Sequence, residues 1–105
     1  MTDKIVVFST CSTADEAGKL ARHLVDQRLA ACVNVIRTVD SYYRWKGEVQ
    51  QDEEFLLVIK TSRELFGRLR AEWDKQHSYQ IPELIALPII DGAPNYLNWM
   101  EGELA

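Results

Sequence analysis

Three side chains in the sequence carry soft or borderline donor atoms, namely Cys11, Cys32 and His77. Cys11 lies between an apolar run and a segment with helical spacing. A thiol at a helix N-terminus is favoured as thiolate, because the positive end of the helix dipole stabilises the anion. This position predicts a lowered thiol pKa at Cys11, which would suit a soft-metal ligand or a redox-sensitive thiol. The favoured interpretation of Cys11 is nevertheless a small residue packed at a strand end, and packing in the core is favoured for Cys32.

His77 begins a loop that precedes the last apolar segment, and Cys11 is a conceivable partner for its imidazole. A Cys and a His form a donor pair that suits copper or zinc. A structural zinc site takes four ligands, so a metal site at Cys11 and His77 would be shared between subunits or completed by water. A surface histidine without a metal role is the favoured interpretation of His77, and His23 is expected to be solvated.

The sequence lacks the residues that several other chemistries require. Iron–sulfur clusters need four thiolates, whereas this sequence has two. No Cys-x-x-Cys follows the first predicted strand, no Gly-rich phosphate loop is present, and no nucleophile stands close to a base in the sequence. Glu83 has no partner nearby in the sequence to support a general-acid role. We therefore expect neither an enzyme nor an organic cofactor.

An aromatic cluster, Tyr42 to Trp45, lies near the tip of a predicted hairpin. It could line a ligand pocket. It could also anchor a contact between subunits, because Tyr, Trp and Arg dominate interface hot spots, and this interpretation is favoured.

The elements that position these residues follow from hydrophobic periodicity. Residues 5–10 form an apolar run typical of a buried strand, and Thr13 to Glu16 has the form of a capping box for an amphipathic helix. From Cys32 to Trp45 the period is two, with Val33, Val35, Val39, Tyr43 and Trp45 on one parity. A turn at residues 46–48 returns the chain through residues 53–59. Ser62 is a predicted N-cap for a second helix that ends near Gln76, an edge strand lies within residues 84–90, and a short helix begins near Pro94.

This order predicts an α+β, ferredoxin-like βαββαβ fold for one domain, residues 1–105. Its right-handed crossovers place both main helices on one face of the sheet. The runs at residues 5–8, 55–59 and 85–90 are apolar at both parities, so the second face is also apolar. An open patch of this size predicts an oligomer. In the alternative, the last helix and the hairpin fold back over this face.

Composition and charge exclude several partners. The formal net charge is −4, and Lys and Arg are scattered among acidic residues, so we expect neither nucleic-acid nor membrane binding. The N-terminal residues lack the pattern of a signal peptide, and two cysteines are compatible with a reducing compartment. The expected location is cytoplasmic.

Five collinear motifs resemble those of the CutA family, the divalent-cation tolerance proteins, and the resemblance runs from about Ile5 to Met100. They are Ala30-Ala31-Cys32-Val33-Asn34, Ser41-Tyr42-Tyr43-Arg44-Trp45-Lys46-Gly47, Ile59-Lys60-Thr61, His77-Ser78-Tyr79-Gln80-Ile81-Pro82-Glu83 and Tyr96-Leu97-Asn98-Trp99.

The resemblance implies a homotrimer similar in architecture to the PII signalling proteins, with the long hairpin extending sheets across subunits. It also implies copper or another divalent metal ion as the ligand, with Cys11 and His77 at the positions of the family's proposed metal ligands. Gln76 stands where some members have a second His, and Ser78 replaces the Pro that is usual in the His-Pro-Tyr loop. A PII-like signalling or scaffold role, with a small molecule or protein partner bound between subunits, is the alternative function.

Overall fold

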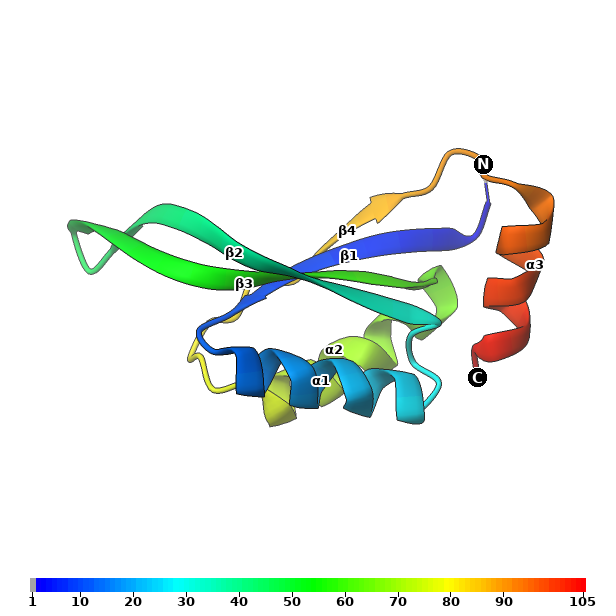
Figure 1. Cartoon of the computed structure of the whole chain (residues 1–105), viewed down its shortest axis with the longest axis horizontal. Helices are drawn as coiled ribbons and strands as arrows, with labels where there is room; N and C mark the ends of the chain where they lie inside the picture. Colours follow the sequence, from blue (N-terminus) through cyan, green and yellow to red (C-terminus); the bar gives the residue numbers. More distant parts are fainter. Residues whose placement is uncertain (1) are drawn as a thin grey trace.

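The computed structural model describes residues 2–105 and contains a four-stranded antiparallel sheet with helices α1 and α2 on one face (Figure 1). The strand order β2-β3-β1-β4 is that of the ferredoxin-like βαββαβ fold, so the predicted fold class is confirmed. No helix within these residues is long and apolar enough to cross a membrane. In chain order the elements are β1 (Lys4–Cys11), α1 (Ala14–Asp26), β2 (Cys32–Trp45), β3 (Glu48–Ser62), the 3-10 turn η1 (Arg63–Leu65), α2 (Phe66–Gln76), β4 (Ile85–Pro88) and α3 (Pro94–Glu103).

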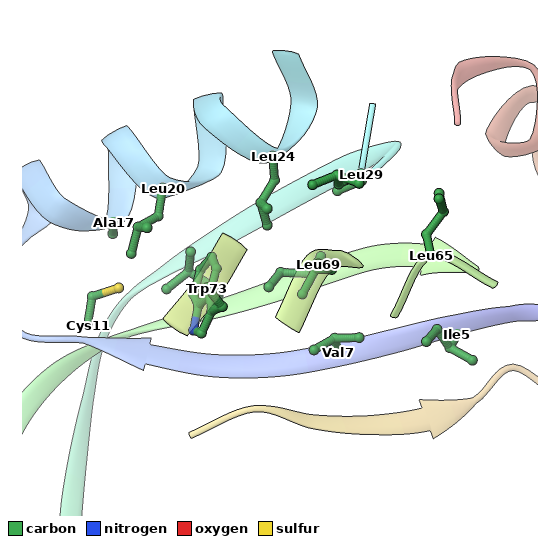
Figure 2. Packing of buried hydrophobic residues seen from close by; sticks show 13 residues of the cluster. Ile5, Val7, Cys11, Ala17, Leu20, Leu24, Leu29, Leu65, Leu69 and Trp73 are labelled. Atoms are coloured by element: carbon green, nitrogen blue, oxygen red, sulfur yellow. The ribbon is translucent and has the colours of Figure 1, made fainter. Parts of the chain in front are cut away.

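The hydrophobic core lies between the sheet and helices α1 and α2 (Figure 2). Alternate residues of a strand point to the same face, so each of the two central strands gives one parity to this core. The core side chains of the sheet are Ile5, Val7 and Cys11 of β1 with Leu57 and Ile59 of β3, and the two helices add Ala17, Leu20, Leu24, Leu69 and Trp73. The opposite parity of the same strands is therefore turned away from the helices.

The helix starts differ in part from the predictions. The Thr13 hydroxyl accepts a hydrogen bond from the Glu16 N–H at 3.1 Å, as a capping box requires. The Glu16 carboxylate does not complete the box, since it accepts from the Ser78 N–H at 2.8 Å. The segment after Ser62 begins as a 3-10 turn, and the Ser62 hydroxyl makes no capping bond. In both places the folded structure supplies contacts that the local sequence does not contain.

The long hairpin of β2 and β3 contains a β-bulge at Thr38. Arg37 pairs with Phe55 and Val39 pairs with Glu54, so Thr38 has no partner in β3. The bulge shifts the alternation by one residue. The prediction that Val33, Val39 and Trp45 lie on one face is therefore wrong. Val33 packs against the core, whereas Val39 and the residues that alternate with it lie on the face of Glu54.

The face of the sheet opposite α1 and α2 is open. The hairpin projects away from it, and α3 packs at one end of the sheet (Figure 1). The alternative in which both fold back over this face is therefore excluded. Ile85 and Leu87 of edge strand β4 are 53% and 45% exposed, and Ile36 of β2 is also exposed. Cys32 is half-buried and pairs with Lys60 in the register, so its predicted core position is wrong.

Candidate functional site

The fold brings Cys11 and His77, which are 66 residues apart, to the same end of the sheet. Cys11 ends β1 with its sulfur turned toward α1 (Figure 2), and His77 follows the last turn of α2. The Cys11 Sγ lies 3.7 Å from the His77 Nε2. Both residues are buried, with exposed fractions of 0% and 8%, so His77 is not a surface histidine.

Both ring nitrogens of His77 are engaged in hydrogen bonds. Nε2 lies 2.7 Å from the Thr10 carbonyl oxygen, which can only accept, so Nε2 carries the proton. Nδ1 then accepts a hydrogen bond from the Tyr79 N–H at 3.0 Å. The Glu16 carboxylate is 3.8 Å from Nδ1 on the same side. The imidazole is thus held as one neutral tautomer, and neither nitrogen has a free lone pair.

Burial raises the pKa of the Cys11 thiol from 9.0 to about 12, and the charges of Glu16 and Glu54 add to this effect. The prediction of a lowered pKa at Cys11 is therefore wrong. The helix dipole favours a thiolate, but removal from water and two nearby carboxylates disfavour it more strongly. At neutral pH Cys11 is a thiol.

A second feature, here called the aromatic cavity, lies between the arm of the hairpin and the loop of residues 77–83. Its volume is about 500 Å³. The bulge at Thr38 contributes to it, since it puts Tyr43 and Trp45 on the same face as Glu54. The lining residues are Thr10, Ser41, Tyr42, Tyr43, Trp45, Glu54, Tyr79, Gln80, Ile81 and Glu83.

Two carboxylates dominate the electrostatics of the aromatic cavity. Glu54 is only 7% exposed and accepts a hydrogen bond from the Tyr79 hydroxyl at 2.7 Å. Burial raises the pKa of Tyr79, and its hydrogen bond to Glu54 raises it further. Burial and then the Glu54 charge also raise the pKa of Glu83. The cavity therefore has a negative potential.

Buried hydrogen bonds fix the loop of residues 77–83 against β1. The indole N–H of Trp73 donates to the Ser9 Oγ at 2.8 Å, and the Ser9 hydroxyl donates to the Glu83 carbonyl at 2.5 Å. At the other end of the loop, the Ser78 N–H bonds to Glu16. These contacts set the positions of His77 and Glu83 together.

Sequence reasoning singled out Cys11, His77, Glu83 and the aromatic cluster, but it missed Glu54, Tyr79 and Ser9. One signal for Glu54 was available, because it has the same parity as Leu56 and Val58 and so belongs to an apolar face. His23, predicted to be solvated, is instead half-buried and bonds to Glu72 of α2 at 3.1 Å. Arg44 of the aromatic cluster does not line the aromatic cavity, and its guanidinium donates to the Gly47 carbonyl.

The sequence matches a family model and several known proteins. A model described as "CutA1 divalent ion tolerance protein" matches residues 5–103. The divalent-cation tolerance protein CutA of Thermus thermophilus is 43% identical over 95 residues, which cover 90% of this chain and 92% of that protein. A chloroplastic CutA protein of Arabidopsis thaliana is 43% identical over 97 residues, which cover 92% of this chain. The chain spans about half of that relative's length, 53%.

Solved structures have the same fold. A divalent cation tolerance protein from Thermus thermophilus superposes with a TM-score of 0.95 at 40% identity, over 97% of this chain and 99% of that chain. The CutA crystal structure from Xylella fastidiosa gives a TM-score of 0.96 at 36% identity, over 99% of this chain and 100% of that chain. The likeness covers the hairpin and the terminal helix as well as the central sheet.

Proposed function

The chain belongs to the CutA1 divalent ion tolerance protein family, and from this premise we propose that it is a homotrimeric divalent-cation tolerance protein. It binds copper or another divalent metal ion and takes part in the response to metal ions. The family is described by ion tolerance and not by a reaction, and the expectation that the protein is not an enzyme is confirmed by family membership. We propose that residues 1–105 act as one domain and that the two free cysteines belong to a reducing, cytoplasmic location.

The observation that supports metal binding most directly is the 3.7 Å approach of Cys11 to His77. A thiolate and an imidazole suit copper, and the soft cuprous ion accepts fewer ligands than zinc. Among residues 2–105 there is no group of three or more Cys, His, Asp or Glu side chains placed to hold a metal. The remaining ligands would therefore come from water or from a second subunit.

Binding at this pair requires two local changes. Cys11 must lose its proton, because only the thiolate is a metal ligand. The His77 Nε2, which faces the Cys11 sulfur, must give up its proton and its bond to the Thr10 carbonyl, and the neutral ring then carries its proton on Nδ1 and loses the bond from the Tyr79 N–H. A bound metal ion supplies the positive charge that favours the thiolate, so the two changes and metal binding are linked.

Calorimetric titration of copper and zinc into the native assembly tests this site. Cys11→Ser should abolish copper binding or weaken it by about tenfold or more, since outer contacts alone change metal affinity by 10–100-fold. Cys32→Ser is the matched control, because it removes a thiol on the opposite face of the sheet. Unchanged affinity in Cys11→Ser, or an equal loss in both variants, would remove Cys11 from the proposal.

The open face of the sheet supports the homotrimer. Its exposed side chains at Ile85 and Leu87 form part of an apolar surface whose burial is favourable by roughly 25 cal/mol per Å². Leu87→Glu should disrupt the assembly, because it places a charge in the contact. Val25→Glu is the control, as Val25 is equally apolar and is 43% exposed on α1. Sedimentation should give three copies for the wild type and the control, and a monomeric wild type would contradict the proposal.

A second candidate function is a PII-like signalling or scaffold role, with a small molecule or partner bound in a cleft between subunits. The aromatic cavity favours it, because about 500 Å³ lies within the usual range of small-molecule sites. Tyr43 and Trp45 on the hairpin arm would form one wall of such a cleft. A metabolite screen monitored by the NMR signal of the Trp45 indole tests this role, and the absence of any shift counts against it.

A further inference from the structure

Glu54 is a buried carboxylate without a counter-ion. Among the side chains that the structure describes, the Tyr79 hydroxyl, which is neutral, is the only one that donates a hydrogen bond to it. Within residues 2–105, no Lys, Arg or His lies within 4 Å of its oxygens. A glutamate that is nine-tenths buried is normally paired, because an unpaired buried charge is costly. The side chain lines the aromatic cavity, so a cation bound there would compensate the charge.

A second carboxylate faces the same cavity. Glu83 lines it, and its raised pKa reflects both burial and repulsion from Glu54. No basic side chain is among the lining residues. Two acidic groups with no basic group among the lining residues favour a positively charged ligand over an anionic one.

The residues that line the cavity favour an organic cation over a metal ion. A hard divalent ion takes six or more oxygen ligands, and no group of three or more metal-ligating side chains exists within residues 2–105. The cavity is also much larger than a single ion needs. Four aromatic residues, Tyr42, Tyr43 and Trp45 of the hairpin with Tyr79, line the cavity, and aromatic rings attract an organic ammonium group. Ile81 adds an apolar surface suited to an alkyl chain.

We propose that the aromatic cavity binds an alkylammonium ligand, with its charged group at Glu54 and Glu83 and its hydrocarbon part against the aromatic rings. This inference rests on the second candidate function and names its ligand class. The ammonium could come from a small amine or from a lysine side chain of a second copy, and the experiment below separates these sources.

The test is calorimetry on the native assembly at roughly 0.15 M salt, where long-range attraction is screened. The probe is 1,4-diaminobutane, and 1,4-butanediol is its neutral counterpart. The diamine should bind and the diol should not. Glu54→Gln should weaken diamine binding by about tenfold or more, since hydrogen bonds to a charged group are about twice as strong as neutral ones. Glutamine still accepts the Tyr79 hydrogen bond, which favours a folded variant.

Glu53→Gln is the matched control, because Glu53 is exposed, adjacent in β3, and therefore on the opposite face. It removes the same charge and should leave affinity within about twofold. Trp45→Leu is a second variant that tests the site without touching a carboxylate, and it should weaken binding by about fivefold through loss of the cation–π contact. Equal weakening by Glu54→Gln and Glu53→Gln would mean general charge attraction and would overturn the proposal.

Three further outcomes separate the inference from the function on which it rests and the two ammonium sources from each other. If the diamine does not bind but a neutral or anionic metabolite shifts the Trp45 indole signal, the ligand class is wrong and the second candidate function stands. If nothing binds, both fail. If an NMR or crystal structure of the assembly shows a lysine of a second copy at Glu54, and the diamine does not compete with it, the ammonium group comes from the second copy and the small-amine source is overturned.

Discussion

Replacing Ser9 with alanine would test how the candidate site is held in place. The Ser9 hydroxyl is fully buried and takes part in two hydrogen bonds, as acceptor from the Trp73 indole and as donor to the Glu83 carbonyl. Ser9→Ala leaves the indole N–H without a partner in the core and releases the end of the loop of residues 77–83. Both losses follow from one oxygen atom, and the substitution is otherwise nearly isosteric.

The magnitude can be worked out from these two bonds. A buried donor left unsatisfied costs about 1–3 kcal/mol, and loss of a typical second hydrogen bond costs about 1 kcal/mol more. We therefore expect the free energy of unfolding to fall by about 2–4 kcal/mol. A domain with ordinary stability of roughly 5–15 kcal/mol would remain folded.

The assay is denaturant unfolding at one fixed protein concentration, because assembly makes stability depend on concentration. Ser62→Ala is the control, since Ser62 is also buried but its hydroxyl makes no side-chain capping bond. This control should change stability by less than about 0.5 kcal/mol. In a Trp73→Phe background there is no indole donor, so Ser9→Ala should cost only about 1 kcal/mol.

Equal costs for Ser9→Ala and Ser62→Ala would refute the reasoning. The same conclusion would follow if the cost of Ser9→Ala did not change in the Trp73→Phe background. In either case the hydrogen bonds would not be the source of stability, and the loop of residues 77–83 would have to be held by its packing.

The remaining predictions concern titration and backbone conformation. In a Cys32→Ser background at pH 8, iodoacetamide should modify Cys11 about a thousandfold more slowly in the native protein than in the denatured one. The reason is that a thiol pKa of about 12 instead of 9.0 lowers the thiolate fraction by that factor. A difference in rate below tenfold would contradict the burial argument. The pKa of Glu83 is raised, so the folded state holds its proton more tightly and stability falls as pH rises above about 4.5. Glu83→Gln should therefore gain stability relative to wild type across that range, and a constant difference in unfolding free energy would contradict this sign. Gly47 has a φ of +83°, so Gly47→Ala should cost about 1 kcal/mol in thermal unfolding, whereas Gly67→Ala in helix α2, with open space around the new methyl group, should stabilise or be neutral.

Periodicity predicted the main elements because it reports local geometry. A two-residue repeat gave the hairpin strands, and a helical repeat with Thr13 at its start gave α1. The turn at residues 46–48 was also predictable, because a tight hairpin turn requires positive φ and Gly47 adopts it without strain. These features depend on neighbours in sequence.

The bulge at Thr38 could not be predicted from alternation. An extra residue in a strand leaves the residue types unchanged and only reassigns their faces, and Thr38 is itself a good strand residue. The assignment of Tyr43 and Trp45 to the face of Glu54 depends on the register with β3. The sequence therefore identified the aromatic residues that the hairpin gives to the cavity, but it could not predict that they line one cavity with Glu54.

The chemistry of Cys11 was mispredicted because two effects compete there. The sequence predicted that Cys11 lies just before α1, and this position favours a thiolate. Its complete burial and the approach of Glu16 and Glu54 come from the tertiary structure, and they raise the pKa. The hydrogen bonds of His77 are likewise made with backbone groups that the sequence does not reveal.

Tyr79 connects the two candidate sites, which lie on opposite faces of the sheet. Its N–H donates to the His77 Nδ1, and its hydroxyl donates to Glu54. A metal ion shared by the Cys11 Sγ and the His77 Nε2 would leave the imidazole proton on Nδ1, which could then no longer accept from the Tyr79 N–H. The displaced Tyr79 would then hold Glu54 less well. Metal binding at His77 and cation binding at Glu54 should therefore change each other's affinity by the same factor. The ratio of copper affinities with and without 1,4-diaminobutane measures this factor, and a ratio of one would show that the two faces act independently.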